Sequence, residues 1–263
     1  MRVYPRWALR VQTCSRRAHF DATLNQRATE GDVEIMNRQC IFPRHHFALL
    51  LAAVGLSMVF ASTSAGMSAN AQETAESQNF GALLAQAALE SVRRDLQYNG
   101  SYVGLDYPWG DVPATQGVCS DVLVRAYRRL GVDLQKRLHE DMRDDFAAYP
   151  SQRVWGLSRP DRNIDHRRVL NLEVFFTRQG AALPASRNPA DYQPGDLVSW
   201  MVPKYGGGTT PHIGIVSAQK AADGTPLVIH HLSGTPRHEN VLFLWPVKRH
   251  FRYHIPAQSR DRA

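Results

Sequence analysis

The residues best suited to chemistry lie in the segment Gly117-Val118-Cys119-Ser120-Asp121. A turn-rich loop leads into this segment, and an amphipathic pattern typical of a helix follows it up to Leu130. A thiol at the start of a helix is a favourable nucleophile, because the positive end of the helix dipole stabilises the thiolate. The backbone N–H of Cys119, unpaired in the first turn, is suited to binding an oxyanion. The cysteine alone leaves two roles open, a nucleophile and a buried, inert thiol.

A cysteine nucleophile also needs a base, and two histidines are placed to provide one. His212 opens an expected strand, and Gly214 shares its face, which leaves room beside the imidazole. His230 ends the next expected strand, where it is suited to hydrogen-bond His212 and orient the ring. His231 points to the opposite face by strand alternation, so we do not expect it in the site.

The pairing register of these two strands decides whether the histidines lie opposite each other. A tight turn at Asp223-Gly224 pairs Ser217 with His230, which separates the two imidazoles. His212 lies directly opposite His230 only with a wider loop, from Ala218 to Pro226. Both registers are compatible with the sequence.

Helices and strands are expected in two successive blocks. Apolar spacing predicts helices over residues 82–98, 119–130, part of 134–149 and 172–180. Short apolar runs predict strands over residues 196–200, 212–217, 227–231 and 241–245. Helices followed by strands, without alternation, indicate an α+β fold in which N-terminal helices pack on an antiparallel β-sheet.

The N-terminal part of the chain has the pattern of an export signal. Residues 36–71 contain a basic start, an apolar stretch of 15 residues and the small-x-small sequence Ala69-Asn70-Ala71. This pattern predicts a signal peptide that is cleaved before Gln72. Because an ordinary signal of this kind would start at Met36, we interpret residues 1–35 as a non-native extension.

Export predicts where the processed chain works and how it is organised. We expect a flexible tether over residues 72–81, a single domain over 82–256 and a periplasmic location. The apolar stretch is shorter than the ~20 residues that a spanning helix needs, so no stable membrane span is expected after processing. An uncleaved anchor is the alternative. Cys119 would then be the only cysteine of the processed chain.

The distribution of charge gives no sign of a nucleic-acid partner. The 263 residues carry a formal net charge of +7. Residues 1–71 hold 8 Lys and Arg against 4 Asp and Glu, and the remaining residues hold 23 against 20. The arginines are scattered and do not form a stripe with interleaved aromatic side chains, so nucleic-acid binding is not expected.

Four stretches resemble the NlpC-type cell-wall cysteine peptidases of the papain-like superfamily. They are Tyr107-Pro108-Trp109-Gly110, Cys119-Ser120, the run from Pro194 to Trp200, and His212-Ile213-Gly214-Ile215-Val216 followed by Ile229-His230. The resemblance implies a papain-like fold with Cys119 as nucleophile, His212 as base and His230 as the residue that orients it. It also implies a tyrosine near the nucleophile, Tyr107, while Tyr107 and Trp109 are candidates for cleft walls or for core positions.

Two features depart from that family's pattern. Val118 stands where the family has an aspartate, and Asp121 stands where a glycine is usual. A long insertion, roughly residues 132–168, resembles the exported YijF-like subgroup of the superfamily. Within it, Asp165 and His166 are candidates for substrate binding, and the alternative for Asp165 is a cap on the following helix.

Three functions follow from these residues. The first is a cysteine hydrolase that cleaves amide bonds in peptidoglycan stem peptides through an acyl-enzyme. The second is a catalytically silent module that binds cell-wall peptides. The third is a zinc site of His212 and His230 with Asp165 or His166, which no typical ligand spacing supports. We therefore expect neither a metal nor a cofactor.

Overall fold

The computed structural model describes residues 52–92 and 95–261. Residues 1–35 and the first part of the leader expected over 36–71 lie outside the described residues. The helices are α1 (Ala52–Val92), α2 (Cys119–Arg129), α3 (Leu134–Asp144), α4 (Ser151–Trp155) and α5 (Val169–Arg178). The strands are β1 (Gln97–Tyr98), β2 (Gln116–Gly117), β3 (Ala182–Leu183), β4 (Leu197–Pro203), β5 (Thr209–Lys220), β6 (Pro226–His230), β7 (Arg237–Glu239) and β8 (Arg249–Phe251). Within the described ranges, no helix combines the length and the apolar character that crossing a membrane requires.

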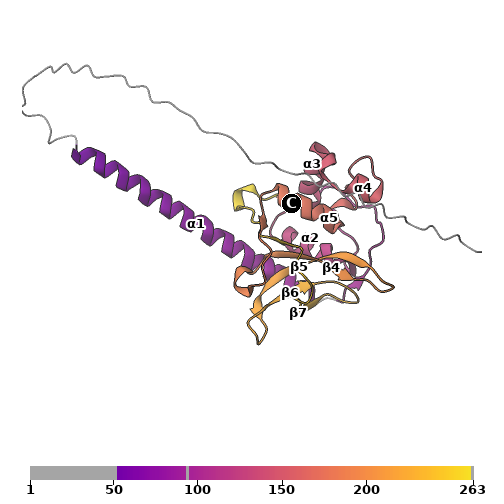
Figure 1. The fold of residues 1–263 in the computed structure, drawn as a ribbon. Coiled ribbons are helices and arrows are strands. Elements are labelled where there is room, and N and C mark those ends of the chain that lie inside the picture. Colours follow the sequence, from indigo (N-terminus) through magenta and orange to yellow (C-terminus); the bar gives the residue numbers. More distant parts are fainter. Residues whose placement is uncertain (1–51, 93–94, 262–263) are drawn as a thin grey trace, which may run out of the picture. The chain divides into compact units, whose positions relative to one another are not determined.

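The main sheet has six strands in the order β3-β8-β4-β5-β6-β7, and every neighbouring pair is antiparallel. Figure 1 shows α2 to α5 grouped on one side of strands β4 to β7. The short strands β1 and β2 form a separate parallel pair. The expected α+β class, with helices packed on an antiparallel sheet, is confirmed.

Strand β5 separates two hydrophobic layers. Ile213 packs with Leu123 of α2 in the larger core, which lies between the sheet and the helices. A second, smaller layer is centred on Trp200 at the other face of the sheet. Because side chains alternate along a strand, His212 and Gly214 face this second layer. The first half of β5 therefore borders both layers.

The first helix differs from the expected one at both ends. Residues 72–81 are helical and do not form the expected flexible tether. Phe80 is buried, and its ring packs on Tyr127 with 6.0 Å between centroids, which fixes this part of α1 to the domain. The helix ends at Val92 instead of reaching residue 98, because Gln97 and Tyr98 pair with β2.

The strand expected over residues 241–245 is wrong. The final strand is β8, and residues 241–245 form a turn-rich connection before it. Val241 and Leu242 are buried in the second layer, and the Leu242 carbonyl accepts a hydrogen bond from the Trp200 indole. Apolar residues reflect burial here, and a short apolar run does not distinguish a strand from a buried turn.

Candidate active site

Cys119 is the first residue of α2 and lies in the larger core, with 5% of its surface exposed. Burial raises the pKa of its thiol to about 11, and the nearby Asp121 carboxylate acts in the same direction. A backbone hydrogen bond from Ile213 opposes this rise in part. Desolvation therefore outweighs the expected effect of the helix N-terminus, and the thiol is protonated at neutral pH.

Asp121 organises the turn at which α2 begins. Its carboxylate accepts a hydrogen bond from the Val118 N–H at 2.7 Å, so it caps the helix that begins at Cys119. Arg167 of the insertion donates to the same carboxylate through Nε at 2.9 Å and Nη2 at 3.0 Å. Both side chains are at most 4% exposed. A buried ion pair with two hydrogen bonds thus holds the turn that begins at Cys119.

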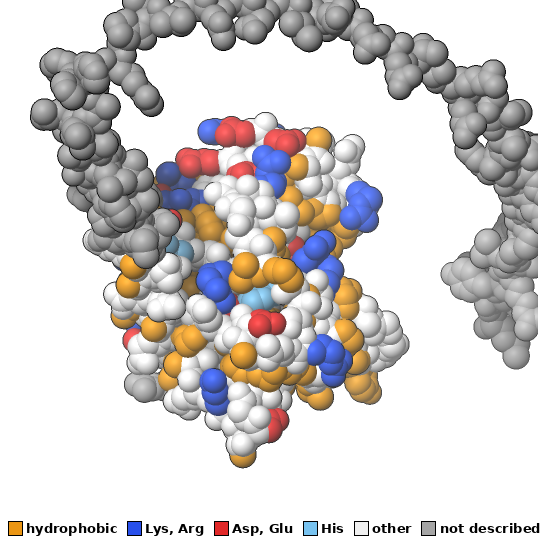
Figure 2. Space-filling model, turned by 60° about the vertical axis from the view of Figure 1, so that its left-hand side comes forward, with side chains coloured by type: hydrophobic (Ala, Val, Ile, Leu, Met, Phe, Trp, Pro, Cys, Tyr) orange, Lys and Arg blue, Asp and Glu red, His pale blue; other side chains and the backbone are white. Residues whose placement is uncertain are grey.

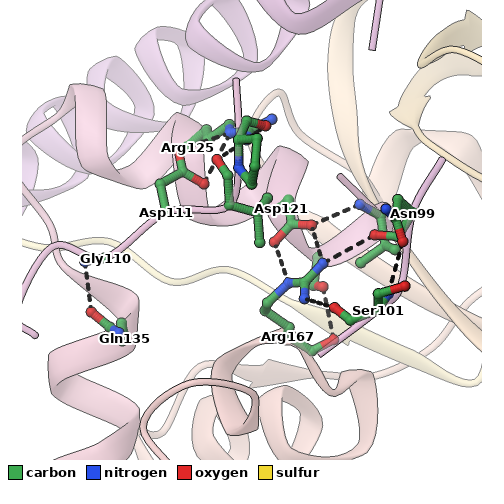
Figure 3. A network of polar contacts seen from close by, with 12 residues as sticks. Asn99, Ser101, Gly110, Asp111, Asp121, Arg125, Gln135 and Arg167 are labelled. Carbon is green, nitrogen blue, oxygen red and sulfur yellow. Dashed lines mark hydrogen bonds and ion pairs between the residues drawn. The ribbon is translucent and has the colours of Figure 1, made fainter. Parts of the chain in front are cut away.

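Arg167 also joins three separate segments around the nucleophile. Figure 3 shows its side chain facing Asp121, with Asn99 and Ser101 close to it. The guanidinium donates to the carbonyls of Ser101 at 3.2 Å and Asn99 at 3.3 Å. The Arg167 carbonyl in turn accepts from the Ser120 hydroxyl at 2.8 Å. The insertion is therefore part of the support for Cys119 and for the loop after β1.

The two histidines meet in a register that neither expectation gave. Gly214 lies opposite His230, so His212 is a diagonal neighbour of His230. The Nε2 atom of His212 nevertheless lies 2.9 Å from Nδ1 of His230. A Cβ at Gly214 would lie 3.2 Å from the His230 Cβ and 2.6 Å from a methyl carbon of Val228. The missing side chain at Gly214 thus lets the imidazoles reach each other diagonally.

Glu239 of β7 extends this contact and sets the tautomers of both rings. Its Oε1 atom lies 3.0 Å from Nε2 of His230. An ionised carboxylate only accepts, so we assign the His230 proton to Nε2, and Nδ1 then accepts from Nε2–H of His212. Neutral His212 is left with an unprotonated Nδ1, the form that a general base requires.

Burial keeps both imidazoles neutral. Desolvation lowers the pKa of His212 to about 3, and the neighbouring His230 acts in the same direction. Desolvation also lowers the pKa of His230, although its hydrogen bond with Glu239 opposes the change. The resting site therefore combines a protonated thiol with neutral rings.

Cys119 contacts β5 through Ile213, the residue next to His212, whereas the His212 side chain faces the second layer and does not line the groove at Cys119. The backbone of Ile213 hydrogen-bonds the Cys119 thiol, and His212 is the preceding residue. The His212 ring stacks on Trp200, with 5.8 Å between ring centroids and 24° between planes. Within the described contacts, the thiol and the imidazole share no direct hydrogen bond. Such bonds between catalytic groups are often long without substrate and shorten when it binds.

Tyr107 and Trp109 are not brought to the nucleophile. The Tyr107 ring packs edge-on against His139 of α3 at 5.2 Å, and the Arg162 guanidinium lies 5.6 Å from its centroid. The Trp109 N–H donates to the Asp133 carboxylate at 2.7 Å. Both residues therefore hold the loop before α2 against the insertion.

Tyr98, and not Tyr107, lines the groove at Cys119. Tyr98 is 46% exposed, and partial desolvation raises the pKa of its hydroxyl, with the neighbouring Cys119 as the next largest cause. Both residues line a groove of about 400 Å³, together with Trp155, Arg168 and Pro211. A separate cavity of about 340 Å³ between α1 and the Pro194-Gly195 turn contains none of the candidate residues.

Asp165 and His166 are used inside the insertion and do not line this groove. Asp165 is 1% exposed and accepts from the Asp161 N–H at 2.5 Å and from Arg168 Nη1 at 2.9 Å. It does not cap α5, whose N-cap residue is Arg168. His166 is buried, and desolvation lowers its pKa to about 3. The ion pair of Asp165 with Arg168 fixes one residue of the groove wall.

The described histidines give no support to the alternative of a zinc site. No group of three or more His, Cys, Asp or Glu side chains within the described ranges is arranged to hold a metal ion. Both ring nitrogens of His230 already have partners.

The surface charge is scattered on the face drawn in Figure 2. Lys and Arg side chains lie there as separate spots, several beside acidic ones, and form no continuous basic stripe.

Comparison with known proteins places the chain in a family. The family model described as "Domain of unknown function (DUF1287)" matches residues 85–253. The chain belongs to the DUF1287 family. An Escherichia coli (strain K12) protein described as "Uncharacterized protein YijF" is 50% identical over 172 residues, which is 65% of this chain and 81% of the relative. The resemblance to the YijF-like subgroup is thereby confirmed.

A solved structure is similar at a much greater distance. The structure of NlpC1 from Trichomonas vaginalis is 14% identical, with a TM-score of 0.38. The match covers 67% of this chain and 45% of that one. A likeness at this level says nothing about the activity of the DUF1287 chain.

Three site residues of this DUF1287 chain were not identified from the sequence. The sequence places Tyr98 in an expected helix, Arg167 among several arginines of the insertion, and Glu239 between two expected strands without a role. Glu239 carried a usable signal, since an acidic residue shortly after a strand that ends in His230 can pair back onto it. Arg167 carried none, because its partner Asp121 is far away in the sequence.

Proposed function

We propose that this protein is an exported cysteine hydrolase that cleaves amide bonds in peptidoglycan stem peptides. Cys119 is the nucleophile, His212 the general base and His230 the residue that orients it. The observation that carries the proposal is the hydrogen-bonded series His212–His230–Glu239 on strands β5 to β7, together with a thiol at the start of α2 that is bonded by the backbone of Ile213, the residue next to His212. Both the groove at Cys119 and the resemblance of its motifs to NlpC-type peptidases support it.

The reaction begins from a neutral thiol and a neutral imidazole. As the Cys119 sulfur attacks the amide carbon, the thiol proton passes to Nδ1 of His212, so no free thiolate has to form beforehand. The developing oxyanion is bound by the backbone N–H of Cys119 and by the Tyr98 hydroxyl. His212 then protonates the leaving amine, and a thioester remains on Cys119.

Hydrolysis of the thioester uses the same groups in reverse. A water molecule gives a proton to Nδ1 of His212 and attacks the carbonyl carbon of the thioester. As the acid is released, His212 returns this proton to the departing sulfur of Cys119. His230 and Glu239 hold the ring so that Nδ1 stays available, and they stabilise the imidazolium that forms in each half. Trp200 and Trp245 enclose the His212 ring.

One observation favours a second candidate, a catalytically silent module that binds cell-wall peptides. Burial raises the pKa of Cys119 to about 11, which is the behaviour of a structural thiol. A silent module would bind muropeptides without turning them over. A hydrolase that transfers the proton during attack has the same resting state, so turnover separates the two.

The test is digestion of purified peptidoglycan by the exported protein, with products identified by mass spectrometry. We expect wild type to release peptides that have gained one water at a single amide. Cys119→Ala should release none while its circular dichroism and melting temperature match wild type, and Arg153→Gln, an exposed change outside the groove, serves as the control. Equal products from wild type and Cys119→Ala would refute the hydrolase, and binding without products would favour the silent module.

A further inference from the structure

Arg168 lies on the wall of the groove that holds Cys119. Two arginines, Arg167 and Arg168, line this groove, and no Asp or Glu side chain does. The charge of Arg167 is compensated by the buried carboxylate of Asp121. Arg168 is also paired, with the buried Asp165, but through Nη1 alone, so it is the arginine of the groove that has donors left for a ligand.

The guanidinium of Arg168 is fixed on two sides. Nη1 donates to Oδ1 of Asp165 at 2.9 Å, and the central carbon lies 4.2 Å from the Trp155 ring centroid. Asp165 is itself held by the Asp161 N–H and by the Asn171 amide. Nε and Nη2 of Arg168 donate to no other described residue. A pre-positioned planar group with free donors thus lines the same groove as the nucleophile.

We propose that Arg168, supported by Trp155, binds a carboxylate of the substrate next to the amide that Cys119 attacks. A guanidinium and a carboxylate form two parallel hydrogen bonds, which select for a planar anion. The indole holds the guanidinium through a cation–π contact and provides an apolar wall. This inference rests on the proposed function and narrows its substrate to peptides with a free carboxylate beside the scissile amide, as opposed to their amidated forms.

The experiment compares two synthetic probes, L-alanyl-γ-D-glutamyl-meso-diaminopimelate with its carboxylates free and the same peptide with them amidated. For wild type we expect kcat/KM to be about tenfold or more higher for the free acid, since hydrogen bonds to charged groups contribute that much. In Arg168→Gln the ratio should fall to about one. Arg153→Gln removes an exposed charge from α4 outside the groove and should leave the ratio unchanged.

Two outcomes would overturn the inference. One is an unchanged ratio in Arg168→Gln, and the other is an equal loss for both probes, which indicates a structural role alone. Should Arg168→Gln fail to fold, Arg168→Lys keeps a charge beside Asp165 but lacks the planar fork. Arg168→Lys should then lower the ratio of kcat/KM between the free acid and the amidated probe, and an unchanged ratio contradicts the inference.

A binding measurement separates this inference from the proposed function. Calorimetry on Cys119→Ala gives the affinities of both probes without turnover. If wild type cleaves neither probe, the hydrolase proposal fails, while a preference for the free acid that Arg168→Gln abolishes still supports the carboxylate site. Equal affinities, or no binding of either probe, contradict it.

Discussion

The two sides of the candidate site are built in different ways. On the sheet side, His212, His230 and Glu239 lie on three successive strands and contact one another directly. On the helix side, the turn that begins at Cys119 is held by Arg167, an ion-pair partner from an insertion far along the chain. The sheet side is formed by local strand alternation, whereas the helix side depends on a long-range buried charge pair.

The largest expected effect tests the helix side. Arg167→Met leaves Asp121 buried without its partner, and breaking such a pair costs about 3–5 kcal/mol of unfolding free energy. The double variant Asp121→Leu/Arg167→Met removes both charges and should recover most of that stability. Urea denaturation measures both, and a single variant as stable as wild type would show that the pair does not support the turn.

A smaller effect is expected from overpacking the sheet side. Gly214→Ala places a Cβ 2.6 Å from a Val228 methyl carbon and 3.2 Å from the His230 Cβ. We expect a loss of about 1–3 kcal/mol in stability, together with displacement of the His230 ring from His212. Nitrogen NMR of the imidazoles reports the tautomers, and unchanged spectra would mean that the diagonal contact does not need glycine.

Glu239 provides a test of the tautomer assignment with little effect on folding. Glu239→Gln still offers an oxygen to Nε2 of His230, whereas Glu239→Ala offers none. We expect Glu239→Ala to lower kcat by about tenfold and Glu239→Gln by less, since an orienting partner is lost in the first alone. Equal activity of wild type and Glu239→Ala would remove Glu239 from the site.

The last prediction concerns the dependence of the unfolding free energy on pH, whose change per pH unit is small. The pKa values of His212 and His166 are about 3 in the folded chain, below the ordinary value of ~6.5. The unfolded chain therefore takes up protons first as the pH falls. Their stabilisation is present above pH ~6.5 and is lost toward pH ~3, by at most about 1.4 kcal/mol per pH unit for each ring.

His166→Gln is the matched variant for that titration. It removes one buried histidine outside the groove. The decline in unfolding free energy below pH ~6.5 should therefore become shallower by up to about 1.4 kcal/mol per pH unit. Chemical denaturation at a series of pH values measures the slope. A slope identical to that of wild type would show that His166 is not buried as a neutral ring.

The sequence was sufficient to predict the parts of the site that depend on local pattern. The start of α2 at Cys119 and the strands that carry His212 and His230 follow from periodicity and turn residues. The register was not predicted, because contact between the histidines was expected only if they lay directly opposite each other, and Gly214 is the residue opposite His230. Gly214 was noted as leaving space, and that space is what permits the diagonal contact.

The parts that sequence reasoning missed are those set by tertiary contacts. Tyr98 lies beside Cys119 because β1 pairs with β2 just before α2, which no local pattern indicates. The thiol pKa was expected to be lowered, yet burial in the larger core raises it. Desolvation depends on everything packed around Cys119, and that is a property of the complete fold.

The most direct measurement of the central claim is the mass of the protein quenched in acid during turnover of peptidoglycan peptides. We predict an adduct equal to the acyl portion of the substrate, located on the peptide that contains Cys119 and absent from Cys119→Ala. Release of cleaved peptides with no adduct, or with an adduct elsewhere, would contradict the assignment of Cys119 as the nucleophile.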